Sequence, residues 1–175
     1  LFYTLAGAKH IDTFDISFCA KAIMDIKVSA IQQGYSYNKF FNLLNDLHHG
    51  KDIAGTAPEI AAKLPTDSAI FTQQMKGYRI FGNGWRPGNY DAENLNANEY
   101  AVLQAMKISD YDFIWSNVAD LHTKTTKQYD IINLSNIFEW SPTLLVPTIE
   151  NLRNNVKPGG HILVQSGEPI GMHTN

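Results

Sequence analysis

The sequence predicts an α/β protein with a Rossmann-like, open, mainly parallel sheet, flanking helices and a helical insertion at residues 34–110, called here the predicted insertion. Short apolar strands near residues 10–16, 112–117, 129–134 and 161–165 are separated by stretches of helical periodicity. Strands that alternate with helices favour parallel pairing. The 175 residues, 44% of them apolar and 18% charged, fit one globular domain.

Composition limits the functions open to the chain. It carries 14 Lys and Arg against 17 Asp and Glu, and this net charge of -3 argues against a general nucleic-acid binder. A single cysteine excludes a disulfide framework and a multi-cysteine metal site. No apolar run approaches the roughly 18 residues of a spanning helix, and no signal peptide is recognisable. We expect a cytoplasmic protein with no integral membrane segment and no nucleic-acid partner; composition leaves the oligomeric state open.

The chain starts at Leu1 rather than at methionine. Residues 1–6 have the character of the last turns of a helix. Gly7 suits the C-cap of that helix, because glycine adopts the left-handed conformation without a Cβ clash. We therefore expect the natural protein to have further residues upstream.

The first strand and the helix after it follow from local patterns. Residues 10–16 alternate apolar and polar side chains up to a strand end near Asp15, and Ser17 can cap the helix that follows. Helical spacing then covers residues 18–31, and Gly34 ends it. The apolar positions of this helix are Cys19, Ala22, Ile23, Ile26, Ala30 and Ile31. Its cysteine is therefore expected in the core.

The predicted insertion contains several helices and one long loop. Its helices are expected over residues 35–49, 59–64, 68–75 and 94–108. Glycine and proline mark residues 78–90 as a loop. That loop is either an ordinary connection or a segment that closes over substrate, with Arg79 or Arg86 reaching a carboxylate.

Beyond the predicted insertion the pattern changes to buried strands at residues 112–117 and 129–134. Ser141 and Pro142 begin a short turn. The next helix is expected to start near Pro147, because a proline inside a helix removes a hydrogen bond.

This last helix is expected to present Ile149, Leu152 and Val156 on one face. The Lys-Pro-Gly-Gly run at residues 157–160 then stops it, and a strand follows at 161–165. In such parallel sheets, ligands bind at the carboxyl ends of the strands.

Residues 129–166 combine strand, helix, Lys-Pro-Gly-Gly and strand, and they resemble the second half of a class I S-adenosylmethionine-dependent methyltransferase fold. Residues 11–17 resemble its second strand, and Asn117-Val118 resembles the end of its third. The resemblance implies one transferase-like domain over residues 1–175 whose first strand and glycine-rich loop precede Leu1. Because that strand is central in the family's sheet, a gap is expected in the core.

A narrower resemblance rests on Leu-Ser-Asn-Ile-Phe-Glu-Trp at residues 134–140, which is similar to a stretch of the betaine-lipid synthase type of enzyme. The opening segment, residues 1–17, also resembles that family. It implies transfer of the 3-amino-3-carboxypropyl group of S-adenosylmethionine to diacylglycerol, rather than transfer of a methyl group.

The resemblance also implies a cofactor site at the strand ends. A carboxylate accepts two hydrogen bonds, which suits Asp15 to a ribose diol; its other interpretation is a solvated acid at the helix start. Asn117 either contacts adenine or caps the turn after it, and Asp120 is the substitute if the register slips. The expected cofactor-binding residues are Asp15, Ile16, Asn117, Val118 and Ser135.

Three residues are expected to be catalytic: Asn136, Glu139 and Trp140. Asn136 lies where the fold places residues that face the transferred group. Glu139 is either a general base for an amine or hydroxyl nucleophile or a surface acid near a helix start. Trp140 is either a wall for the sulfonium or a core tryptophan.

No metal is expected. His48 and His49, with Asp46 and Asp52 nearby, are residue types that can bind a metal. Adjacent histidines point in different directions on a helix, and the spacing typical of helical metal sites is absent.

The sequence thus predicts an S-adenosylmethionine-dependent transferase that moves a methyl or 3-amino-3-carboxypropyl group to a small-molecule or lipid acceptor. A lipid acceptor would suit Phe40, Phe41 and Phe71, which are otherwise core residues. The alternative is a non-catalytic binding module that kept the fold. A dehydrogenase is disfavoured, because Lys-Pro-Gly-Gly after the fourth element is not characteristic of one.

Overall fold

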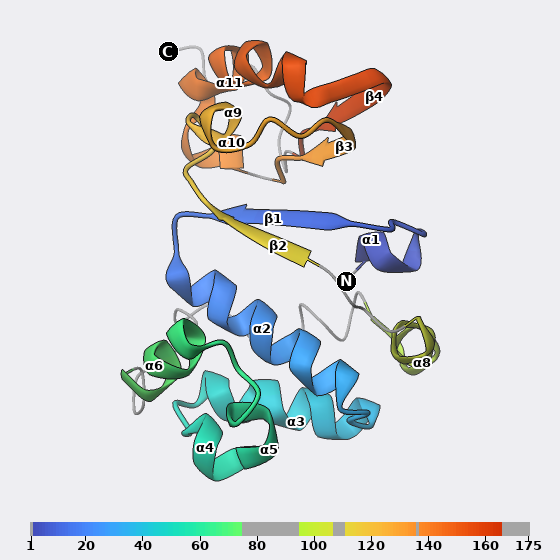
Figure 1. Ribbon diagram of the computed structural model, residues 1–175, viewed down its shortest axis with the longest axis vertical. Helices are drawn as coiled ribbons and strands as arrows, with labels where there is room; N and C mark the ends of the chain where they lie inside the picture. Colours follow the sequence, from blue (N-terminus) through green and yellow to red (C-terminus); the bar gives the residue numbers. More distant parts are fainter. Residues whose placement is uncertain (1, 75–94, 107–110, 136, 166–175) are drawn as a thin grey trace. The chain divides into compact units, whose positions relative to one another are not determined.

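The protein, described by a computed structural model, is a mixed α/β chain with short strands (Figure 1). The structure describes residues 2–74, 95–106, 111–135 and 137–165. It divides into two compact units, and each is described by itself. Unit 1 comprises Leu1–Thr13 and Ser17–Phe113, and unit 2 comprises Phe14–Ile16 and Ile114–Asn175.

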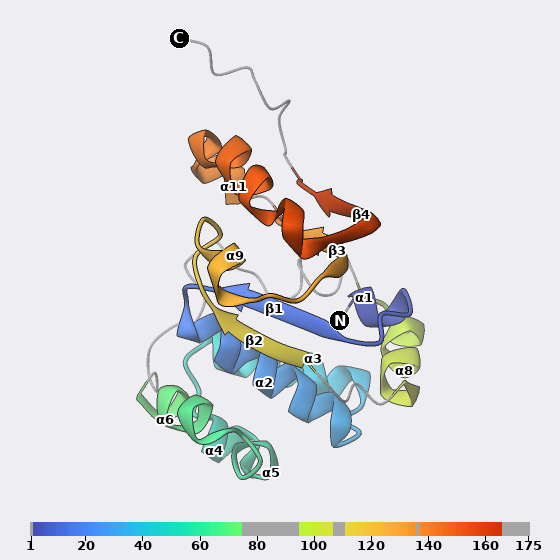
Figure 2. The ribbon, with the colours of Figure 1, turned by 45° about the horizontal axis from the view of Figure 1, so that its top comes forward.

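The strands form two small sheets. Strand β1 (Ile11–Asp15) pairs with β2 (Tyr111–Trp115), and β3 (Tyr129–Asn133) pairs with β4 (Val156–Leu163). The β3–β4 pair is parallel, and β1 and β2 point the same way in Figures 1 and 2. The predicted α/β class and the four strands are confirmed, and each described sheet has two strands.

The N-terminal part follows the sequence prediction closely. Helix α1 (Phe2–Leu5) ends at Gly7, whose φ of 89° lies in the left-handed region. The Gly7 amide donates to the Thr4 carbonyl at 2.9 Å and closes the helix. Helix α2 (Phe18–Gln32) begins after Ser17, as expected, although the serine side chain makes no capping hydrogen bond.

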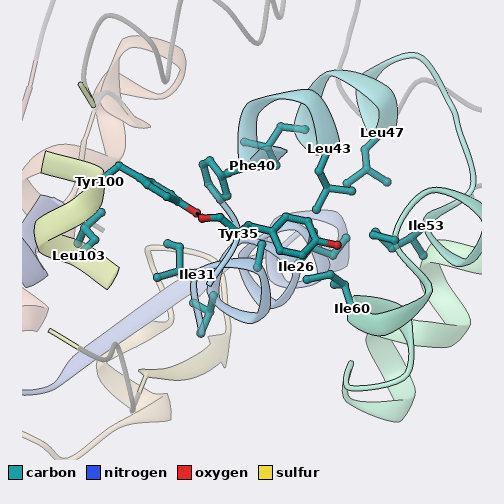
Figure 3. Packing of buried hydrophobic residues seen from close by; sticks show 14 of the residues in the cluster. Ile26, Ile31, Tyr35, Phe40, Leu43, Leu47, Ile53, Ile60, Tyr100 and Leu103 are labelled. Carbon is teal, nitrogen blue, oxygen red and sulfur yellow. Dashed lines mark hydrogen bonds between the residues drawn. The ribbon is translucent and has the colours of Figure 1, made fainter. Parts of the chain in front are cut away.

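A core of aliphatic and aromatic side chains holds the helices of unit 1 together (Figure 3). It joins α2 to α3 (Tyr37–His48), α4 (Ile53–Thr56), α5 (Pro58–Ala61) and α8 (Ala97–Ala105). Its most buried large side chains are Ile26, Phe40, Leu44, Leu47, Ile60, Tyr100 and Leu103. Their removal from water is the main favourable term for this unit.

Several helix boundaries in the predicted insertion differ from expectation, because caps decide them. Helix α3 starts at Tyr37 rather than at residue 35, since the Ser36 side chain accepts from the Lys39 amide at 3.3 Å. Helix α8 starts after Asn96, which forms a capping box with Glu99.

Two further helices are shifted. Helix α5 ends at Ala61, before the expected residue 64, and α6 (Thr66–Gln74) begins two residues before the expected residue 68. The Lys63 amide donates to the Ile60 carbonyl at 2.9 Å, which tightens the chain beyond α5. The loop expected at residues 78–90 lies outside the described residues.

Unit 2 packs short helices against the β3–β4 sheet. They are α9 (Leu121–Lys124), α10 (Ile137–Trp140) and α11 (Leu145–Leu152), with 3-10 turns at Pro142–Leu144 and Arg153–Asn155. Their core consists of Val118, Leu121, Ile132, Leu134, Phe138 and Leu152, with Phe14 and Ile114 packed against it. The ends of all four strands therefore contribute to one hydrophobic core.

A short turn precedes α11, as predicted, and α11 begins two residues before the start expected near Pro147. The helix begins at Leu145, so Pro147 lies in its first turn. Backbone N–H groups in the first turn have no acceptor within the helix, so a proline at this position removes no helical hydrogen bond. The expected apolar face also breaks off, because Ile149 is 37% exposed and Val156 already belongs to β4.

The role predicted for Lys-Pro-Gly-Gly was wrong, since residues 157–160 lie inside β4 and do not stop a helix. The register shifts between Tyr129 and Ile131, so this run forms an irregularity in a parallel pair. A Cβ on Gly160 would lie 2.8 Å from the Asp130 carbonyl oxygen, and Gly159 has a φ of 81°. The glycines therefore serve close strand approach and a left-handed backbone.

None of the helices in the described ranges is both long enough and apolar enough to cross a bilayer.

Two buried threonines allow a matched stability test. Thr148, in α11, is 1% exposed, and its hydroxyl has no hydrogen-bond partner among the described residues. Thr72, in α6, is 4% exposed and donates to the Ala69 carbonyl at 2.9 Å. We expect Thr148→Val to raise the free energy of unfolding by about 1 kcal/mol, because it removes an unsatisfied polar group. Thr72→Val is expected to be neutral or destabilising in the same urea titration, and the reverse order would contradict the prediction.

Glu59 is held in its charged form by two neighbours. The Tyr35 hydroxyl donates to its carboxylate, and Lys39 Nζ lies 3.0 Å from Oε1. These hydrogen bonds, that from Tyr35 first, lower the pKa of Glu59 from 4.5 to about 2.

The lowered pKa of Glu59 predicts a pH-dependent contribution to stability. A depressed carboxyl pKa stabilises the folded state above pH 4.5, and that contribution disappears as the pH falls to about 2. We expect Glu59→Gln to be less stable than the wild type near pH 6, with the difference vanishing by pH 2. Urea unfolding across this range tests it, with the exposed Glu150→Gln as the control. A difference that does not depend on pH would contradict the assignment.

Candidate functional site

The carboxyl ends of β1 and β2 lie side by side in unit 2. The Ser116 amide donates to the Asp15 carbonyl at 3.2 Å, and the Trp115 indole Nε1 donates to the Ile16 carbonyl at 3.1 Å. Asp15 is half-buried, whereas the Ile16 side chain is 66% exposed. Two of the expected cofactor residues therefore lie at the strand edge where ligands bind in parallel sheets.

Asn117 organises the turn after β2. Its Oδ1 accepts from the Ala119 amide at 2.6 Å and from the Asp120 amide at 3.2 Å. Its Nδ2 donates to Asp120 Oδ2 at 3.0 Å. Both acceptor positions of the amide oxygen are thus used within the turn, as the capping interpretation expected. The Val118 side chain, 7% exposed, packs into the core of unit 2, so its backbone is the part available at this edge.

Ser135 follows β3 with an unusual backbone. Its φ of 49° makes it the one non-glycine residue with positive φ in the described part of the chain. Its amide donates to Asn133 Oδ1 at 2.9 Å, and its carbonyl accepts from the Gln165 amide at 2.9 Å. Hydrogen bonds from both sides therefore hold an exposed serine in a conformation that costs energy.

The three expected catalytic residues are only partly described. Asn136 and the side chain of Trp140 lie outside the described residues. Glu139 is exposed on α10, and Phe138, 4% exposed, anchors that helix to the core. The structure thus brings Asp15, Ile16 and Asn117 together and places Ser135 and Glu139 after the next strand of the same unit.

A second group of polar side chains, not singled out in the sequence analysis, lies in unit 1. His10 Nε2 lies 2.6 Å from Asp12 Oδ1 and 3.6 Å from Asp112 Oδ2. Ligand atoms of the three residues lie within 4.8 Å of one another. The pattern His-x-Asp on a strand places two side chains on one face and was the available signal. The third residue comes from β2 and is found only through strand pairing.

The histidines considered in the sequence have other surroundings. The rings of His48 and His49 meet edge to face with centroids 5.2 Å apart. Asp46 pairs with Lys51 at 2.7 Å, and Asp52 accepts from the Ala54 amide at 3.1 Å as the cap of α4. Structural pairings therefore account for the two acids.

Comparison of the chain with protein-family models, with curated proteins and with solved structures finds no match.

Ser135 provides a test of strain at this site. We expect Ser135→Gly to raise the free energy of unfolding by about 0.5 kcal/mol, because relief of the left-handed penalty exceeds the entropy cost of glycine. Ser135→Ala keeps the penalty, removes only the hydroxyl and is the matched control. Urea denaturation measures both variants. A glycine variant less stable than the alanine variant would show that the backbone is not strained.

Proposed function

We propose that the chain is an S-adenosylmethionine-dependent transferase in which Asp15 binds the cofactor ribose. The observation that carries the proposal is the position of this half-buried carboxylate at the carboxyl end of β1, beside the end of β2. Side chains at that edge of a parallel sheet face the ligand in open α/β folds.

The residues present fit part of such a cofactor. A carboxylate offers acceptors to both hydroxyls of a ribose diol, which suits Asp15. Because the Asn117 amide oxygen is occupied by Ala119 and Asp120, adenine recognition would fall to backbone groups near Val118.

The strand pairing gives further support. In the Rossmann-like arrangement, β1 and β2 would be the second and third strands, and β3 and β4 the fourth and fifth. Pairing of β1 with β2 and of β3 with β4 agrees with that order.

The cofactor is a sulfonium and supplies the electrophile, so the protein mainly binds, orients and handles protons. In this proposal Glu139, which is exposed on α10, accepts a proton from the hydroxyl or amine of the acceptor. The acceptor is a small molecule or a lipid, and the transferred group is methyl or 3-amino-3-carboxypropyl. Product analysis separates the two reactions: methyl transfer leaves S-adenosylhomocysteine, whereas aminocarboxypropyl transfer leaves methylthioadenosine.

Calorimetric titration of S-adenosylhomocysteine tests the cofactor site. We expect a Kd near 1 μM, about -8 kcal/mol, and at least tenfold weaker binding by Asp15→Asn, because the ribose loses a charged acceptor. Asp130→Asn is the matched control: this exposed aspartate of β3 pairs with Lys157 at 2.9 Å.

Each other outcome of the titration has a definite meaning. Failure of the wild-type chain to bind would favour the non-catalytic binding module. Binding that Asp15→Asn leaves unchanged would overturn the role of Asp15.

A further inference from the structure

Unit 1 contains a pocket of about 510 Å³ on the side of α2 that carries Asp25 and Ser29. Its wall also includes His10, Lys63, Tyr111 and Asp112. Its lining is therefore rich in side chains that can hydrogen-bond or coordinate a ligand. Every residue of this wall belongs to unit 1, so the pocket is separate from the proposed cofactor residues of unit 2.

Two residues of the pocket wall belong to the His10, Asp12 and Asp112 group. Asp12 and Asp112 come from the paired strands β1 and β2, and the Thr13 hydroxyl donates to the Asp112 carbonyl at 3.4 Å. The Asp12 side chain is 4% exposed, whereas His10 and Asp112 are 45% and 64% exposed. One ligand is therefore fixed inside the protein, and two can be reached from solvent.

The chemistry of the three side chains suits a transition metal. One imidazole nitrogen and two carboxylate oxygens form a mixed nitrogen and oxygen set, which binds Zn²⁺, Mn²⁺ and similar ions. An imidazole beside the carboxylates separates this group from an ordinary acidic cluster. Two carboxylates this close repel each other, and a dication between them removes the repulsion.

The pocket offers space for the water or small-molecule ligand that would complete the coordination of a metal held by three protein ligands. Metal sites with three protein ligands keep at least one position for water or a small molecule. The inner wall is held rigidly, because the Asp25 carboxylate accepts from Tyr111 and Ser68 and lies 2.9 Å from Lys21 Nζ. Asp25 is itself only 9% exposed and lines the pocket.

We propose that His10, Asp12 and Asp112 bind a divalent transition-metal ion at the wall of this pocket, with open coordination positions for water or a small ligand. Of this site, the sequence pattern indicates only the pairing of His10 with Asp12. The site does not depend on the proposed transferase function, because it uses other residues in another unit.

Metal titration of the full chain tests the proposal. After treatment with a chelator, the protein is titrated with Zn²⁺ or Mn²⁺ by calorimetry and with Co²⁺ by absorption spectroscopy. We expect one equivalent to bind. His10→Ala and Asp112→Asn should each weaken binding at least tenfold, because each removes one of three ligands.

The control variants are His161→Ala and Asp130→Asn, an exposed histidine and an exposed aspartate of the other sheet. Thermal unfolding gives a second readout: Zn²⁺ should raise the Tm of the wild type and of both controls, but not that of Asp112→Asn. Because Asp112 is 64% exposed, its amide variant is expected to fold. Equal affinity in the wild type and the ligand variants, or loss of binding in the controls alone, would overturn the site.

Discussion

The pairing of β1 with β2 determines how the chain between these two strands can fold. Parallel strands cannot be joined by a tight turn, so the chain between Asp15 and Tyr111 must form a long crossover. In its described residues, this crossover consists of α2, α3, α4, α5, α6 and α8. Closing so long a loop costs entropy, which the helical core must offset. Both candidate sites exist because this pairing brings together side chains that are distant in the sequence.

Within unit 1, the core and one polar network fix that crossover. The Tyr100 hydroxyl donates to the Tyr35 carbonyl at 2.8 Å (Figure 3). Gln104 Nε2 donates to the same carbonyl at 2.6 Å, so both bonds tie α8 to the segment between α2 and α3. The first residue of β2, Tyr111, donates to Asp25 of α2. These bonds join the two ends of the crossover through buried groups, and loss of one partner would leave the other unsatisfied.

The Asp25 network shows how a buried charge is tolerated. Burial opposes the charged form of Lys21, but hydrogen bonds to Asp25 and Asp67 outweigh it and raise the pKa of Lys21. Burial first, and then the hydrogen bond to Asp25, raises the pKa of Tyr111, so this phenol remains a donor. The network thus keeps Lys21 charged and Tyr111 protonated next to the pocket.

Apolar spacing and capping residues predicted much of the secondary structure. The features that they did not predict depend on contacts between residues distant in the sequence. The spacing of apolar residues predicted both ends of α2 to within about one residue. Gly7 ends α1, as expected. Lys-Pro-Gly-Gly at residues 157–160 indicated the end of a helix, but in the structure it forms part of β4 and pairs with β3. This pairing is possible because Gly160 has no Cβ and lets the two backbones approach closely. Among site residues, Asp15 and Asn117 could be found from strand ends. Asp112 could not be grouped with His10, because no local pattern links them.

The geometry of a single strand explains why β1 can contribute to two sites without conflict. Successive side chains of a strand point to opposite faces, so Asp12 and Asp15, three positions apart, lie on opposite faces of β1. The Asp12 side chain is 4% exposed, whereas Asp15 is half-buried. Asp15 lies at the carboxyl end, where the strand gives way to α2 and the backbone turns. The proposed metal ligand Asp12 and the proposed ribose ligand Asp15 can therefore be substituted one at a time, each without altering the face of β1 that carries the other.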